Sequence, residues 1–179
     1  PFDTAATLTV TKVADTNDGV CNADCSLREA IAVANAGDTI AFSSLFNSTQ
    51  TISLTLGQIA INKGLTITGP GSNLLTISGS SNGANRFFDV AGSLTFNLSG
   101  VTLSGANAPG LFGPGLINNG TTNITNCVIS NNTGNQGGGV DNQAGTMTVT
   151  NSTISGNTAA TGGGIFNQAT LTITNSTVS

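Results

Sequence analysis

Side chains with oxygen ligands gather in one short segment near the start of the sequence, and they are the first candidates for a metal site. Asp15, Asn17 and Asp18 stand in an Asp-x-Asn-Asp-Gly pattern that resembles the beginning of a calcium loop. The bidentate Glu that closes such a loop is absent, and Asp and Asn also favour ordinary turns. Asn22 and Asp24 continue the segment. A calcium site on Asp15, Asn17 and Asp18 is therefore a weak candidate beside a polar turn without metal.

The three cysteines are the second source of chemistry. Cys21 and Cys25 lie in the same polar segment, whereas Cys127 is alone. A structural zinc site needs about four Cys or His ligands in paired spacings, and the chain has three Cys and no His. A Cys21–Cys25 disulfide, formed in an oxidising compartment, is favoured over free thiols. Cys127 is expected to be a small buried apolar residue, and no cofactor is expected.

The composition excludes several classes of function. Gly, Thr, Asn and Ser make up about half of the 179 residues, and the only charged residues are four basic and eight acidic ones. Four cations cannot form the basic face that nucleic acids and anionic membranes require. No apolar run approaches the length of a membrane span, and the absence of His excludes mechanisms that depend on an imidazole.

A repeating unit of 24 to 26 residues indicates the fold class. Its copies are Ile124–Ser130, Val149–Ser155 and Ile173–Ser179, with a looser copy at Leu98–Ser104. Within each unit, short segments alternate between apolar and polar residues with the period of two that is typical of strands. Each repeat is therefore predicted to form one coil of a β-solenoid, with successive coils about 4.8 Å apart.

The alternation assigns each strand residue to the core or to the surface. Leu171 and Ile173 are predicted to point inward, in the columns that Met147 and Val149 occupy one coil earlier. The Thr residues between them point outward and stack into an array of hydroxyl and methyl groups: Thr146, Thr148, Thr150, Thr170, Thr172 and Thr174. Because Thr is β-branched and polar, it also suits any exposed strand.

Asparagine recurs at two corners of the predicted coil. The first series is Asn126, Asn151 and Asn175, and the second is Asn118, Asn142 and Asn167. Asn tolerates the left-handed backbone conformation that a tight corner needs, and stacked Asn side chains can hydrogen-bond along the solenoid axis. Both series are expected to form corner ladders that combine these two roles.

Residues 1–42 differ from the repeats and are predicted to form an N-terminal cap on the rungs of residues 43–179. This part contains an alternating strand segment, the cysteine pair and the one convincing helix, over 27–35. Ser26 and Glu29 are expected to form a capping box at the start of that helix. A helix can cover the apolar end of a solenoid without offering a strand edge.

The run from Asp15 to Ile31, which includes Cys25-Ser-Leu-Arg-Glu-Ala30, resembles the CSLREA domain, an N-terminal module of bacterial secreted and surface proteins. The Asn-Ser-Thr-Ile-Ser and Gly-Gly-Gly-Ile-Phe-Asn repeats resemble the right-handed parallel β-helices of the pectin-lyase-like superfamily. Together these resemblances cover nearly the whole chain. They imply an all-β, right-handed parallel β-helix whose N-terminal cap contains one short α-helix, and a secreted or cell-surface location in bacteria.

Because that superfamily contains polysaccharide lyases and hydrolases, a polysaccharide-binding or polysaccharide-cleaving function is one alternative. Hydrolysis needs two carboxylates that face the sugar from opposite sides, and beyond residue 90 the sequence offers only Asp141. Asp89 and Arg86 are the remaining pair, and an exposed turn with a weak ion pair also explains them. No catalytic residue is assigned, and the chain is expected not to be an enzyme.

A non-enzymatic extracellular structural function accounts best for the low charge, the cap and the repeats. The chain is expected to be a β-helical stalk, an adhesin segment or a subunit of a self-assembling filament. The last repeat leaves strand edges open, and a surface with few charges offers little repulsion, so end-to-end self-association or continuation into further repeats is expected. Binding of ice or another ordered surface through the stacked Thr residues is a further alternative.

Overall fold

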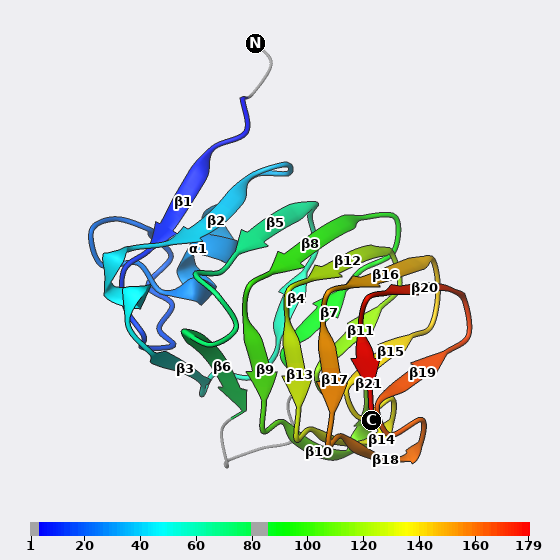
Figure 1. Ribbon diagram of the computed structural model, residues 1–179. Coiled ribbons are helices and arrows are strands. Elements are labelled where there is room, and N and C mark those ends of the chain that lie inside the picture. The colour runs from blue at the N-terminus through cyan, green and yellow to red at the C-terminus, as the bar shows by residue number, and fades with distance from the viewer. Residues whose placement is uncertain (1–3, 80–85) are drawn as a thin grey trace.

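The computed structural model describes residues 4–79 and 86–179 and has the parallel β-solenoid fold expected from the repeats, with about five turns (Figure 1). Its strands form four sheets along the solenoid, which we name A to D. Neighbouring strands within each sheet come from successive coils and run parallel, so residues far apart in the sequence lie side by side. The described residues contain one α-helix, α1 (Leu27–Val33).

The sheets differ in the number and length of their strands. Sheet A contains β1 (Thr7–Val10), β2 (Thr39–Phe42), β5 (Leu65–Thr68), β8 (Thr95–Ser99), β12 (Thr121–Thr125), β16 (Thr146–Thr150) and β20 (Thr170–Thr174). Sheet B contains β3 (Gln50–Leu54), β6 (Leu75–Gly79), β9 (Thr102–Ser104), β13 (Val128–Ser130), β17 (Thr153–Ser155) and β21 (Thr177–Val178). Sheet C contains β4 (Ile59–Ile61), β7 (Phe88–Val90), β11 (Leu116–Asn118), β15 (Val140–Asn142) and β19 (Ile165–Asn167). Sheet D contains β10 (Asn107–Phe112), β14 (Thr133–Gln136) and β18 (Thr158–Thr161).

The sequence repeat sets the register of the strands, so equivalent apolar residues stack into buried columns. In sheet A, Ile124, Val149 and Ile173 pair in successive strands. Ile124 and Val149 are fully buried, whereas Ile173 in the last described coil is 43% exposed. A column is therefore shielded only where a coil lies on both sides of it.

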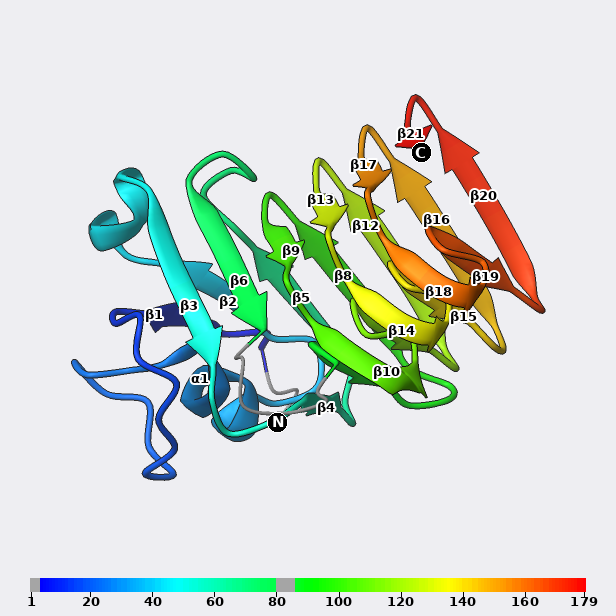
Figure 2. The ribbon, with the colours of Figure 1, turned by 90° about the horizontal axis from the view of Figure 1, so that it is seen from below.

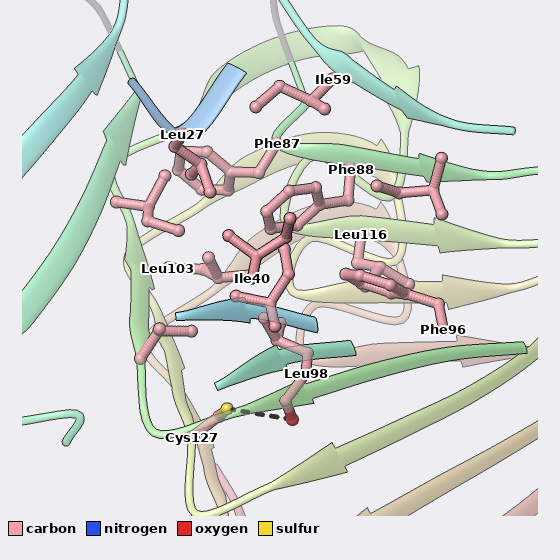
Figure 3. Close-up of a cluster of buried hydrophobic side chains, with 14 of the residues drawn as sticks. Leu27, Ile40, Ile59, Phe87, Phe88, Phe96, Leu98, Leu103, Leu116 and Cys127 are labelled. Carbon is pink, nitrogen blue, oxygen red and sulfur yellow. Dashed lines mark hydrogen bonds between the residues drawn. The ribbon is translucent and has the colours of Figure 1, made fainter. Parts of the chain in front are cut away.

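The helix α1 closes the opposite end of the core. Leu27 and Ile31 of α1 are buried in the same cluster as Ile59 and Phe87. Figure 3 shows Leu27, Ile59 and Phe87 of this cluster. Figure 2 shows α1 at the N-terminal end of the row of coils and β20 at the other end. The helix thus covers the core at the N-terminal end of the described coils, and no helix covers the last described coil.

The cap is continuous with the coils. The strand β2 lies within residues 1–42, yet it pairs with both β1 and β5 in sheet A, because the alternation that defines the repeats already begins at Thr39. The helix is also shorter than expected. It ends at Val33, and the Asn35 backbone N–H donates to Asp38 Oδ2 at 2.7 Å, which turns the chain into β2.

The structure divides the two expected asparagine roles between the two series, which corrects the expectation that each series combines them. The exposed corner residues have left-handed backbones, with φ of 54°, 49° and 48° at Asn126, Asn151 and Asn175. No hydrogen bond joins their side chains within the described residues. The other series forms the ladder, because the side-chain amides of Asn118 and Asn142 each donate to the next Asn carbonyl oxygen at 2.7 Å.

Candidate functional site

All four charged residues beyond the cap lie along one side of the solenoid, at sheet C and its turns. Lys63 follows β4, Arg86 precedes β7, and Asp89 and Asp141 lie within β7 and β15. The strands of sheets A, B and D contain no charged residue. Beyond the cap, sheet C is therefore the side of the solenoid on which the charged groups lie.

Arg86 and Asp89 form a partly exposed ion pair on this side of the solenoid. Arg86 Nη1 lies 2.8 Å from Asp89 Oδ2, and Gln58 Nε2 donates to the same oxygen at 3.3 Å. Asp89 and Asp141 occupy the same outward column, but the strand β11 with Ile117 lies between them. Two strand spacings place their backbones roughly 9 to 10 Å apart.

Asp141 is fully buried, which sets it apart from Asp89. The turns at Gly113 and Gly137 pack on its side chain so closely that a Cβ on either glycine would lie 2.9 Å from Asp141 Cβ. Gln143 Nε2 donates to Oδ2 at 3.4 Å, and Oδ1 has no partner within the described residues. Burial raises the pKa of Asp141, against the opposing effects of the Gln143 hydrogen bond and the positive charge of Arg86.

This arrangement does not supply a pair of catalytic carboxylates. Glycoside hydrolysis needs two carboxyl groups that reach the same glycosidic bond. Asp141 has no exposed surface, and Asp89 is held by Arg86 and Gln58. Arg86, Asp89 and Asp141 therefore lie on one side of the solenoid, but they do not form an open site together.

Replacing Asp141 with asparagine is expected to raise the free energy of unfolding at pH 7 by about 1 kcal/mol. A carboxyl whose folded pKa is raised destabilises the folded state once the pH exceeds the ordinary value of 3.8. The advantage of Asp141→Asn should therefore disappear as the pH falls below that value. Urea denaturation at pH 7 and near pH 3.5 measures the effect, with Asp89→Asn, at a partly exposed carboxylate in the same column, for comparison. A variant that is less stable than the wild type at pH 7 would contradict this account.

Two of the three candidate calcium ligands, Asp15 and Asp18, bind other groups of the protein. The buried Asp15 carboxylate binds Arg28 Nε and Nη2 at 2.7 and 3.0 Å and accepts the backbone N–H groups of Thr55 and Leu56. Asp18 Oδ1 instead accepts the Val20 N–H at 2.9 Å, in a local turn. These contacts favour the polar turn over the calcium site, because Asp15 and Arg28 together join the cap to the first coil.

The capping box of α1 is present and is part of a larger buried cluster. Ser26 N–H donates to Glu29 Oε2 at 2.7 Å, and Glu29 N–H donates to Ser26 Oγ at 3.1 Å. Glu29 Oε1 also accepts hydrogen bonds from the Thr16 hydroxyl and the Asp18 N–H. Burial alone would raise the pKa of Glu29, but these hydrogen bonds and Lys12 lower it to about 2.

The cysteines lie where the sequence analysis expected them. Cys21 and Cys25 form a disulfide, with their sulfur atoms 2.03 Å apart. Cys127 is a buried free thiol whose Sγ lies 3.6 Å from the Leu98 carbonyl oxygen (Figure 3). Burial raises the pKa of this thiol to about 11, so Cys127 has the character of a core residue and not of a nucleophile.

Sequence reasoning did not assign Arg28 and Lys63, although both line a pocket between α1 and β4. It also missed a hydrogen bond between successive coils, which the buried Asn132 Nδ2 donates to Oδ1 of the half-buried Asn157 at 3.1 Å. The only available signal for Arg28 was its place beside the capping box.

No helix in the described part of the chain is long and apolar enough to cross a membrane. Comparison of the chain with protein-family models, with curated proteins and with solved structures finds no match.

Proposed function

We propose that this chain is a non-enzymatic structural protein of the bacterial cell exterior, a rigid stalk, adhesin or filament segment that associates through one end of its solenoid. The observation that carries the proposal is the stack of parallel coils, in which each of the four sheets grows by one strand per coil along the solenoid axis. The strands β18, β19, β20 and β21 each have a neighbour on one side only. Unpaired strand edges of this kind accept further strands.

The apolar columns at this edge give the association a driving force. Ile173 and Val178 are 43% and 45% exposed, whereas their counterparts one coil earlier, Val149 and Ile154, are fully buried. A further coil, from the same chain or from a second copy, would cover them. Burial of apolar surface contributes about 25 cal/mol per Å².

The closed end determines which copies can meet. Because α1 covers the core at the N-terminal end, a further coil, from the same chain or from a second copy, packs at the other end of the described coils. Growth into a filament requires in addition that β1, the edge strand of sheet A at the closed end, accepts a strand. Open-end association therefore produces pairs first and longer rods only where β1 takes part.

The extracellular location is supported by the Cys21–Cys25 disulfide, since disulfides persist mainly in oxidising compartments. A non-enzymatic role is supported by the burial of Asp141 and by the pairing of Asp89 with Arg86. Electron microscopy of the purified 179-residue chain, combined with assays for cleavage of acidic and neutral polysaccharides, tests the proposal. Particles joined end to end, in pairs or in longer rods, are expected, without cleavage of either polysaccharide. Separate single particles at high concentration, or cleavage abolished by Asp89→Asn, would overturn it.

Binding of ice is a second candidate, favoured by the register of the Thr array. Each of the three Thr residues of β16 pairs with a Thr of β20, and in β12 the series is interrupted by Asn123. All three strands lack charged residues and expose the array on one sheet. Thermal hysteresis that is lost in Thr148→Lys and kept in Thr153→Lys, on sheet B, would support this function. A wild-type protein without hysteresis would dismiss it.

A further inference from the structure

We propose that the pocket between α1 and β4 binds a small ligand that carries one carboxylate group. The pocket has a volume of about 310 Å³, at the lower end of the range for small-molecule sites. Its wall contains Arg28 of α1 and Lys63, which follows β4. The inference goes beyond the structural role proposed above and does not depend on it.

One N–H group of the Arg28 guanidinium makes no hydrogen bond to the described residues. A guanidinium group has five N–H groups. Within the described residues, Nε and one N–H of Nη2 bind Asp15, the other N–H of Nη2 binds the Gly57 carbonyl oxygen, and one N–H of Nη1 binds that of Gln58. The contacts hold the guanidinium in place and leave the second Nη1 N–H for a ligand.

Lys63 keeps a second such donor. Its ammonium group has three N–H groups, and two of them bind the carbonyl oxygens of Ala32 and Ala34 at 3.0 and 2.7 Å. These carbonyl groups lie at the end of α1, so the helix fixes the position of the ammonium group. The third N–H is unused within the described residues.

The charge of the pocket matches a single anion. The buried Asp15 carboxylate compensates the charge of Arg28. Lys63 has no carboxylate within ion-pair distance in the described part of the chain, although its charge contributes to lowering the pKa of Asp38. The site therefore carries about one net positive charge, and hydrogen bonds from cationic donors to a carboxylate are among the stronger ones in proteins.

The other residues that line the pocket indicate the chemistry of the remainder of the ligand. The exposed Ala32 and Ala60 give the pocket a small apolar surface, and the exposed amides of Asn17 and Asn62 add neutral hydrogen-bonding groups. A small body with one apolar face and a few polar groups fits this wall. A sugar acid and the C-terminal residue of a peptide share this chemistry.

Calorimetric titration at low ionic strength tests the proposal with glucuronate and N-acetylalanine as probes, and with glucose and N-acetylalanine amide as neutral counterparts. At least one acid is expected to bind, and its neutral counterpart is not. The acid that binds identifies the source of the ligand. Failure of both acids, or equal binding of acid and neutral form, would overturn the proposal.

Two variants locate the binding in this pocket. Asn62 is exposed and its side chain makes no hydrogen bond within the described residues, so Asn62→Asp should fold normally. Its new negative charge should weaken binding of the acid at least tenfold. Gln168→Glu makes the same change of charge in the exposed turn between β19 and β20 and should leave binding unchanged. Equal affinity in both variants would place the ligand elsewhere and contradict the assignment.

Discussion

Glu29→Ala is expected to lower the free energy of unfolding at pH 7 by about 3 kcal/mol. The carboxylate accepts the backbone N–H groups of Ser26 and Asp18 and the hydroxyl of Thr16, and it lies 3.4 Å from Lys12 Nζ. An alanine leaves these donors without their partner around a side-chain position that is fully buried. Urea or guanidinium denaturation, followed by circular dichroism, measures the loss.

Glu29→Gln measures the contribution of the charge, because glutamine has nearly the same shape as glutamate but is neutral. Because the folded pKa of Glu29 is about 2 and its ordinary value is 4.5, the charge stabilises the protein above pH 4.5. That stabilisation is lost as the pH falls from 4.5 towards 2. The difference in stability between the wild type and Glu29→Gln should therefore shrink over the same interval. A difference that stays constant from pH 7 to pH 3 would contradict the role assigned to the charge.

Asn118→Ala is expected to cost about 3 kcal/mol of folding free energy. Asn118 is fully buried, and its Oδ1 accepts the Gly120 N–H and the Thr122 hydroxyl at 3.1 and 2.8 Å. Its Nδ2 donates to Asn142 Oδ1 in the next coil at 2.7 Å. The alanine leaves buried polar groups unpaired in two coils at once. Equilibrium denaturation of the variant provides the measurement.

The corner residue Asn126 is the matched control for this substitution. It has a φ of 54° and an exposed side chain, so Asn126→Gly should leave the stability nearly unchanged, because glycine adopts this backbone without strain. Asn126→Ala should cost about 1 kcal/mol through the left-handed backbone alone. Equal losses for Asn118→Ala and Asn126→Ala would mean that the two asparagine series do not differ as the structure indicates.

The repeats made the solenoid predictable because each coil carries the same local information. Alternation alone placed Met147 and Val149 in the core, and both are fully buried. The division of roles between the asparagine series was not predictable in this way. Asn118 and Asn126 are the same residue type near neighbouring corners, and only the path of the backbone decides which side chain is buried.

The proximity of the charged residues at sheet C was harder to predict from the sequence, because these residues come from different coils. Asp141 and Arg86 are far apart in the sequence, and their proximity depends on the strand β11 that lies between β7 and β15. The partner of Asp15 is Arg28, yet the local Asp-x-Asn-Asp-Gly pattern suggested an ion. A local motif shows which side chains could bind a cation, whereas the contacts formed on folding determine whether they bind an ion or another group of the protein.

Sedimentation equilibrium of the wild type and two lysine variants tests open-end association most directly. Ile173 points inward at the open edge of β20, whereas its neighbour Thr172 points outward from the same strand. A lysine at 173 places a charge where the second copy must pack, and a lysine at 172 adds the same charge away from that contact. The wild type and Thr172→Lys are predicted to rise from the monomer mass of 17.7 kDa with concentration, while Ile173→Lys remains at 17.7 kDa. A wild-type chain that stays monomeric at every concentration, or an Ile173→Lys variant that associates as the wild type does, would contradict the account.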